Sequence, residues 1–264
     1  MNVIGMSTGA LYPDYATEEA LDIAAQMGYS VVEVYLQTHG EYAPDFVTQL
    51  RERLDALGLA AHSVHNDIRH FDLWSPYTRR ATEARDLFNR LIELAAELGA
   101  QAITWHGICE RLTTNVPYEA FIERTGQLAE QAQAAGVTLT LENVSWCFLR
   151  TVAHIHRVRA ERLPLGFTFD PFQAAEADES PTAIMRAMGD QLTTVHLSDY
   201  GADGGRHQPM GEGVIDWPPV FETLAALDYQ GPLIVEVPYR GDLNVLRRAH
   251  AFVSRALGES HAGT

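Results

Sequence analysis

Residues 118–144, YEAFIERTGQLAEQAQAAGVTLTLENV, contain the unit that decides the fold. Tyr118–Ala135 has the apolar spacing of an amphipathic helix, and residues 138–144 form an apolar run typical of a strand buried on both faces. Gly136 lies between them, and glycine ends helices well because it takes the left-handed conformation without strain. The stretch therefore predicts a helix that returns to a buried strand, and this strand ends in an acid, Glu142.

The same alternation extends in both directions along the chain. Strand-like runs are predicted at residues 3–8, 30–36, 60–66, 102–107, 138–144, 164–170, 192–199 and 232–239. Amphipathic helices are expected between them, and Thr17 is the expected capping residue of the first. Eight strand–helix repeats without a linker predict an α/β fold, a single (β/α)₈ TIM barrel over residues 1–257, with a disordered tail at 258–264. The alternative is an open doubly wound sheet, but Gly5–Gly9 is a poor version of the Gly-rich phosphate turn that such a sheet usually carries.

Composition excludes several kinds of chemistry. The 264 residues include 19 basic and 35 acidic side chains, which gives a net charge of −16 and makes nucleic acid an unfavourable partner. Every basic residue other than histidine is arginine, and without lysine the chain can form neither a Schiff base nor a lysine-dependent phosphate loop. No apolar run approaches the ~20 residues that cross a bilayer, and the first residues do not resemble a secretory signal. We therefore expect a cytoplasmic protein without membrane contact.

Acidic and imidazole side chains end most of the predicted strands. In a barrel of this kind the carboxyl ends of the strands meet at the face that holds the catalytic groups. Glu142, Asp170, His196 and Glu236 form such a set on four consecutive strands. Gathered charges are costly without compensation, so the set predicts a site for one divalent metal ion, either Mn²⁺, Mg²⁺, Co²⁺ or Zn²⁺. Glu33, in the run at 30–36, is interpreted either as a salt-bridged charge under a loop or as a further functional group.

The motifs around these residues resemble those of a known superfamily. They are LENV at 141–144, FTFD at 167–170, VHLSD at 195–199, RHQPMGEG at 206–213 and IVEV at 234–237. The chain resembles the xylose isomerase-like TIM-barrel superfamily, which includes sugar phosphate isomerases and epimerases, inosose dehydratases and AP endonuclease family 2. In the ketose epimerases the residues that match the four predicted ligands bind one metal ion, and the two glutamates also exchange protons with the sugar.

The leading functional prediction is a metal-dependent sugar or sugar-phosphate isomerase/epimerase that acts on a small, sugar-like substrate. A proton next to the substrate carbonyl would leave and return through an enediolate, with Glu142 and Glu236 as catalytic acid and base. Three alternatives are kept: an inosose or keto-sugar dehydratase-like lyase, an AP endonuclease-like hydrolase, and a non-catalytic barrel that binds a metal or a small molecule. A homo-oligomer is compatible with the sequence.

Six further residues are predicted to contact the substrate. They are His65, His106, Gln173, Arg206, His207 and Trp105. Arg206 suits a carboxylate or phosphate group. His65 and His106 match positions that bind another zinc ion in the endonuclease, so a second metal there is the less favoured alternative. Gln173 and Gly205 stand where the endonuclease has a His and an Asp that bind its third zinc ion, and these departures argue against the nuclease.

Overall fold

The computed structural model describes residues 2–66, 72–109 and 116–262. Eight parallel strands pair in chain order, and β1 pairs with β8 to close the barrel. The strands are β1 (Ile4–Ser7), β2 (Val31–Tyr35), β3 (Ala60–His65), β4 (Ala102–Trp105), β5 (Thr138–Glu142), β6 (Gly166–Phe169), β7 (Leu192–Leu197) and β8 (Leu233–Val235). The predicted single (β/α)₈ barrel is confirmed.

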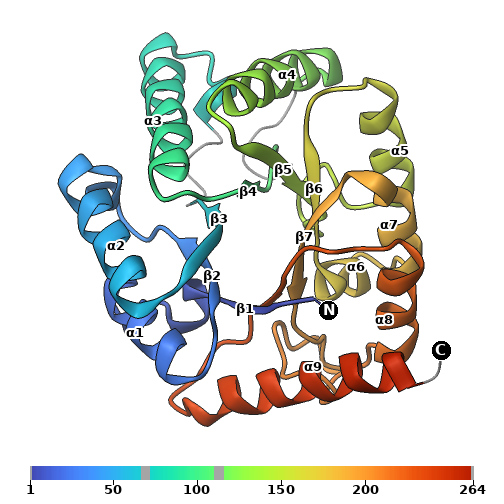
Figure 1. The fold of residues 1–264 in the computed structure, drawn as a ribbon. Helices are drawn as coiled ribbons and strands as arrows, with labels where there is room; N and C mark the ends of the chain where they lie inside the picture. The colour runs from blue at the N-terminus through green and yellow to red at the C-terminus, as the bar shows by residue number, and fades with distance from the viewer. Residues whose placement is uncertain (1, 67–71, 110–115, 263–264) are drawn as a thin grey trace.

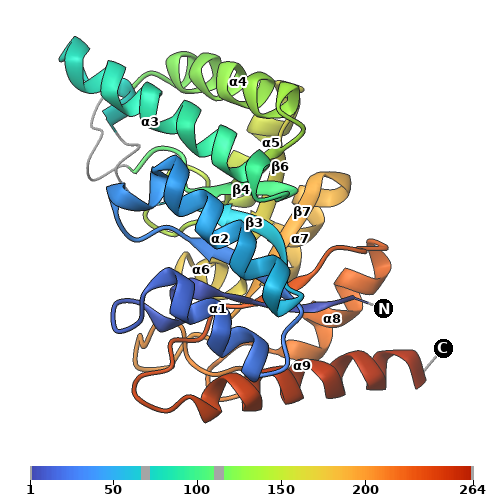
Figure 2. The ribbon, with the colours of Figure 1, turned by 60° about the vertical axis from the view of Figure 1, so that its left-hand side comes forward.

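Helices surround the barrel (Figures 1 and 2). They are α1 (Thr17–Gln26), α2 (Pro44–Leu57), α3 (Thr78–Glu97), α4 (Tyr118–Ala134), α5 (Val152–Ala160), α6 (Pro171–Glu176), α7 (Pro181–Met188), α8 (Trp217–Ala226) and α9 (Asn244–Ala262), with short 3₁₀ turns η1 (Thr8–Leu11), η2 (His39–Tyr42) and η4 (Gly189–Gln191). The longer helices each bury an apolar stripe. In α3, for example, Ala84, Phe88, Leu91 and Ala95 are buried at helical spacing. Within the described residues, no helix is both long enough and apolar enough to cross a membrane.

The glycines predicted to end helices do so, but Thr17 does not cap the first helix as predicted. Gly58 after α2 has φ 65° and Gly136 after α4 has φ 81°, the left-handed conformation that favours glycine. Ala16, rather than Thr17, occupies the capping position of α1. Thr17 is the first residue of the helix itself, and its hydroxyl donates to the buried carboxylate of Glu41, at Oε1, over 2.9 Å.

The last helix extends beyond the residue where the sequence predicted a tail. α9 runs from Asn244 to Ala262, so the segment after Gly258 is helical up to that residue, and 263–264 lie outside the described residues. The segment contains no proline, and a single glycine inside a helix costs only about 1 kcal/mol.

The interior of the barrel contains a polar layer. Side chains at alternating strand positions point inward and bond across the barrel axis. Thr104 Oγ1 on β4 lies 3.4 Å from Thr168 Oγ1 on β6, which lies 2.7 Å from Thr140 Oγ1 on β5. His62 on β3 reaches Thr194 Oγ1 on β7 at 3.0 Å. These groups are buried and satisfy one another, so the layer forms a rigid base beneath the strand ends.

Candidate metal centre and pocket

Four ligand-type side chains converge at the carboxyl ends of the strands. Glu142 is the last residue of β5, Asp170 follows β6 directly, and His196 lies in β7. Glu236 follows β8. His196 Nδ1 lies 3.2 Å from Glu142 Oε1 and 3.3 Å from Glu236 Oε2. One ligand atom from each of the four residues lies within 4.8 Å of the others, so the structure brings the whole predicted set together.

Asp170 has one carboxylate oxygen that is fixed and one without a partner. Oδ1 caps α6 by accepting from the backbone N–H groups of Phe172 at 2.8 Å and Gln173 at 3.3 Å. The Asn143 side chain exchanges two hydrogen bonds with the Asp170 backbone, both at 2.8 Å. Among the described residues, the buried Oδ2 has no hydrogen-bond partner. An unpaired buried carboxylate oxygen is costly, and a cation between the four side chains would satisfy it.

Burial and neighbouring charges move the pKa values of the four groups apart. Burial raises the pKa of Asp170 well above its usual value, and the charges of Glu142 and Glu236 raise it further. Burial also acts to raise the pKa of each glutamate, but attraction to His196 outweighs burial and lowers both pKa values. For His196, burial acts to lower the pKa, and the surrounding glutamates raise it well above 6.5. The shifts of the His196 and glutamate pKa values thus have a common origin in their mutual attraction.

Glu33 lies inside the barrel and not under a loop. It is fully buried, and its Oε2 accepts from Ser63 Oγ at 2.8 Å and Thr104 Oγ1 at 2.9 Å, with His196 Nε2 at 3.1 Å. Burial acts to raise the pKa of Glu33, but attraction to His196 and its hydrogen bond lower it to about 2. Glu33 is ion-paired, as one of the two interpretations held, but its partner is His196 inside the barrel and it does not lie under a loop.

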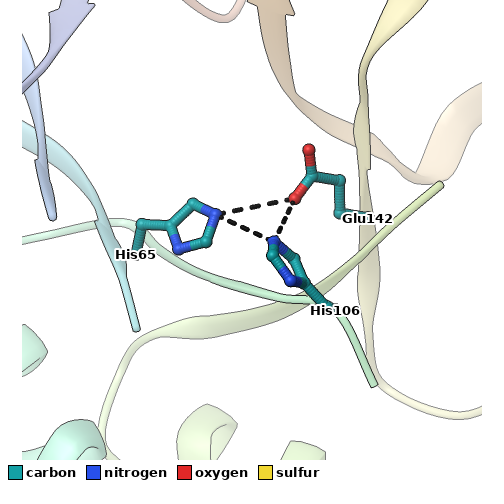
Figure 3. A group of neighbouring side chains, drawn as sticks. All are labelled: His65, His106 and Glu142. Atoms are coloured by element: carbon teal, nitrogen blue, oxygen red, sulfur yellow. Dashed lines mark hydrogen bonds and ion pairs between the residues drawn. The ribbon is translucent and has the colours of Figure 1, made fainter. Parts of the chain in front are cut away.

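His65, His106 and Glu142 form a second cluster beside the first (Figure 3). The Nε2 atoms of both rings point toward Glu142 Oε2, at 3.6 Å from His65 and 3.0 Å from His106. The two Nε2 atoms lie 3.2 Å apart, and His65 Nδ1 lies 3.1 Å from the carbonyl oxygen of Asn66. Glu142 thus directs one oxygen toward each cluster. The geometry suits either hydrogen bonds to a substrate or a second metal ion.

The stability of the metal-free protein should fall as pH rises from about 6.5 to about 9. Burial acts to lower the pKa of His65, but its hydrogen bond to Glu142 and the nearby carboxylates raise it from 6.5 to about 9. A histidine with a raised pKa contributes stability that is complete below its unfolded pKa and is lost as pH passes its folded pKa. Urea denaturation across this range measures the slope. His65→Gln should flatten it, and a parent protein that becomes more stable with rising pH would contradict this expectation.

A cavity of about 310 Å³ opens beside both clusters. Five of the six predicted substrate contacts line it: His65, His106, Gln173, Arg206 and His207. Glu142 and Glu236 also face the cavity, and Tyr12, Tyr35, Trp146 and Phe172 supply aromatic walls. This volume and mixture of apolar walls with a few polar groups suit a small molecule.

Trp105 is the predicted contact that the structure does not bring to the cavity. Among the described residues, the cavity lining does not include it, and its indole stacks on Trp74 with ring centroids 5.8 Å apart. Phe88 packs against the same indole at 5.2 Å. Successive strand residues point to opposite faces, so Thr104 points into the barrel and Trp105 points toward the helices. The expected substrate contact is therefore corrected to a packing role.

Arg206 lies at the rim of the cavity in an ion pair that the sequence did not predict. Its Nε donates to Glu176 Oε1, and the other oxygen of Glu176 accepts from Ser145 Oγ. The backbone N–H of Ser145 also donates to Gln173 Oε1 at 2.9 Å. The pair offsets much of the positive charge that Arg206 would present to an anionic substrate group. Within the described part of the chain, the other N–H groups of its half-exposed guanidinium have no acceptor and can donate to hydroxyl oxygens.

Asp199 organises the loop between β7 and α8, which carries Arg206 and His207. Its side chain is buried and accepts four N–H donors at 2.8–3.1 Å, from the backbones of Tyr200, Gly211 and Ile215 and from the indole of Trp217. All of these bonds stay within residues 199–217, so Asp199 shapes the loop and is not part of the ligand set. Its position at the end of β7 in the sequence did not reveal this role.

The barrel and the polar groups at its strand ends define a TIM barrel with a candidate active site at the carboxyl face. The family model described as "Xylose isomerase-like TIM barrel" matches residues 21–256, and the chain belongs to this family.

Individual relatives share the same architecture. The chain is 21% identical to the L-ribulose-5-phosphate 3-epimerase UlaE of Escherichia coli (strain ATCC 8739) over 238 residues, which cover 83% of this chain and 81% of that protein. The solved structure of an L-ribulose 3-epimerase superposes with a TM-score of 0.81 at 20% identity, covering 100% of this chain and 97% of the other. A D-tagatose 3-epimerase-like protein gives a TM-score of 0.83 at 18% identity, covering 100% and 99%. At these identities the two structures show a common fold.

Proposed function

We propose that the chain is a divalent-metal-dependent sugar epimerase that acts on a ketose or ketose phosphate. The main support for this proposal is that Glu142 and Glu236 belong to the candidate metal set and also border the cavity. The names of the relatives, L-ribulose-5-phosphate 3-epimerase and L-ribulose 3-epimerase, support this substrate class. Epimerisation at the carbon next to a carbonyl removes a proton from one face and returns one to the other, and two carboxylates can perform these two transfers.

Glu142, Asp170, His196 and Glu236 would bind the metal ion. The unpaired Oδ2 of Asp170 supports this assignment, and so does the raised pKa of this group, because burial and the charges of Glu142 and Glu236 disfavour its ionised form unless a cation is present. Three carboxylates and one imidazole suit Mn²⁺, Mg²⁺, Co²⁺ or Zn²⁺. When bound, such an ion acts as a Lewis acid that polarises a carbonyl and makes the neighbouring C–H more acidic.

The two glutamates approach the cavity from well-separated strands. Glu142 ends β5 and Glu236 follows β8, with β6 and β7 between them in the barrel. One glutamate removes the proton next to the carbonyl to give an enediolate, and the other returns a proton to the opposite face. Each has a histidine close to its Oε2: His106 Nε2 lies 3.0 Å from that of Glu142, and His207 Nδ1 lies 3.8 Å from that of Glu236.

The remaining residues on the cavity wall would hold the sugar. His65, His106, Gln173, Arg206 and His207 offer hydrogen bonds to hydroxyl and carbonyl oxygens. We assign His65 and His106, which line the cavity, to the substrate and not to a second metal ion. Titration with Mn²⁺ should accordingly give one ion per chain. A stoichiometry of two ions per chain would show that His65 and His106 are metal ligands.

A substrate panel tests the proposed function. The protein loaded with Mn²⁺ or Co²⁺ should convert at least one ketose or ketose phosphate into its epimer, and removal of the metal with a chelator should abolish the conversion until the ion is restored. Loss of water from a keto-sugar would identify a dehydratase instead, and nicking of abasic DNA would identify a nuclease. Failure of the whole ketose panel with the metal-loaded protein would contradict the proposal.

A further inference from the structure

Glu33 is a buried carboxylate that the proposed proton transfers do not use. Its exposure is 0%, and it comes from β2, whereas the four candidate ligands come from β5 to β8. The side chain therefore reaches across the barrel interior to His196. Burial of an ionised carboxylate is costly unless the group is paired and hydrogen-bonded. The partners of Glu33 therefore indicate why it is buried here.

His196 presents its two ring nitrogens to different partners. Nδ1 faces the ligand oxygens of Glu142 and Glu236, at 3.2 and 3.3 Å, and is the atom available to a metal ion. Nε2 faces Glu33 Oε2 at 3.1 Å. The ring of His65 stacks on the imidazole with centroids 6.0 Å apart, which restricts rotation of His196. The ring is thus fixed between the metal set on one side and Glu33 on the other.

Glu33 is itself fixed by its neighbours. Ser63 and Thr104 donate to the same Oε2 at 2.8 and 2.9 Å, so this oxygen accepts from three directions and is an anchored acceptor. A carboxylate that accepts from one imidazole nitrogen keeps the proton on that nitrogen and makes the other a better metal ligand.

We propose that Glu33 is a positioning residue that holds the proton of His196 on Nε2 and thereby makes Nδ1 the metal ligand. This inference rests on the proposed metal-dependent function. The carboxylate contributes both geometry and charge: it fixes the plane of the ring, and its negative charge strengthens electron donation from Nδ1.

Titration with Mn²⁺ alone tests this role without relying on turnover. Glu33→Gln keeps an acceptor oxygen but removes the charge, and should raise the Mn²⁺ Kd about 10-fold. Glu33→Leu removes both and should raise it about 100-fold. Thr140→Val is the matched control, because it removes a buried hydroxyl of the same interior layer that bonds to Ile103 O and Thr168 and not to His196. It should leave the Kd within about twofold of the parent value, below the smallest effect expected for a lost ligand partner.

The ring nitrogens of His196 supply a second readout. In ¹⁵N spectra of the protein loaded with diamagnetic Mg²⁺ or Zn²⁺, the parent should show a protonated Nε2. Glu33→Gln keeps an acceptor oxygen and should therefore keep this proton while its Mn²⁺ Kd rises, so this variant tests the contribution of the charge even if Glu33→Leu does not fold. A proton on Nδ1 in the parent, or a parent-like Mn²⁺ Kd in Glu33→Gln, would overturn the role of Glu33.

A parent chain that binds no divalent ion would overturn the proposed function together with this inference, whereas a parent that binds Mn²⁺ as tightly as its Glu33 variants overturns the inference alone.

Discussion

Glu142→Gln should lower kcat by about 10²–10⁴-fold at saturating metal, the usual contribution of a proton-transfer group. The substitution keeps the shape of the side chain and one oxygen that can face His196. In the parent, His196 Nδ1 lies 3.2 Å from Glu142 Oε1. It removes the charge that accepts the substrate proton and the carboxylate oxygen that lies 3.0 Å from His106 Nε2. Because Glu142 is also a proposed metal ligand, the assay must be run at several Mn²⁺ concentrations, so that loss of chemistry is separated from loss of the ion.

Glu41→Gln is the matched control for this prediction. Glu41 is also a buried glutamate, but it lies within η2 and accepts from Thr17 Oγ1 at 2.9 Å and from the Thr38 backbone at 3.1 Å. Among the described residues, the candidate metal groups do not include it. The same change of one oxygen to an amide should destabilise this turn by about 1–3 kcal/mol and leave kcat near the parent value. Full activity in Glu142→Gln would remove Glu142 from the mechanism.

Asp170→Asn should stabilise the metal-free protein and abolish its stabilisation by metal. Burial and the neighbouring glutamates raise the pKa of Asp170, so the ionised carboxylate destabilises the folded state at neutral pH. An amide removes this charge and still caps α6, because asparagine is as good a capping residue as aspartate. The parent should gain about 2.7 kcal/mol at a Mn²⁺ concentration of about 100 Kd, equivalent to a rise in Tm of about 5–10 °C, and the variant should gain little.

Asp199→Asn is the control for Asp170→Asn. It removes a buried carboxylate charge that is not part of the candidate metal site. Both oxygens of Asp199 accept N–H donors, so an amide there turns an NH₂ group toward two other donors. This variant should lower the Tm of the metal-free protein, opposite in sign to Asp170→Asn, and should keep the rise in Tm with Mn²⁺. Thermal unfolding of both variants with and without the ion gives the comparison. A parent-like rise in Tm in Asp170→Asn would show that Asp170 is not a ligand.

The four-residue centre could be predicted from sequence because each ligand lies at or just beyond the carboxyl end of an apolar strand. Parallel strands in a closed barrel bring their carboxyl ends to one face, so Glu142, Asp170, His196 and Glu236 needed only the correct strand count to be placed together. The same reasoning placed His65 on the cavity wall.

Details that depend on orientation or distant partners could not be predicted in this way. Trp105 and His106 are adjacent in sequence, but strand alternation turns only the second toward the cavity. Glu33 takes its three hydrogen-bond partners from positions 30, 71 and 163 residues away, which no local pattern reveals. The pairing of Arg206 with Glu176 likewise joins residues 30 positions apart, on a loop and a helix end whose approach depends on the finished barrel.

Hydrogen exchange with solvent tests the central claim most directly. The metal-loaded protein is incubated in D₂O with the ketose or ketose phosphate that it converts, and deuterium at the carbon next to the carbonyl is followed by NMR. We expect deuterium to enter at that carbon with the parent protein and Mn²⁺, and neither the chelated parent nor Glu142→Gln should support exchange. Exchange that proceeds equally well without the metal ion, or epimer formed without deuterium from solvent, would contradict metal-assisted proton transfer by Glu142 and Glu236.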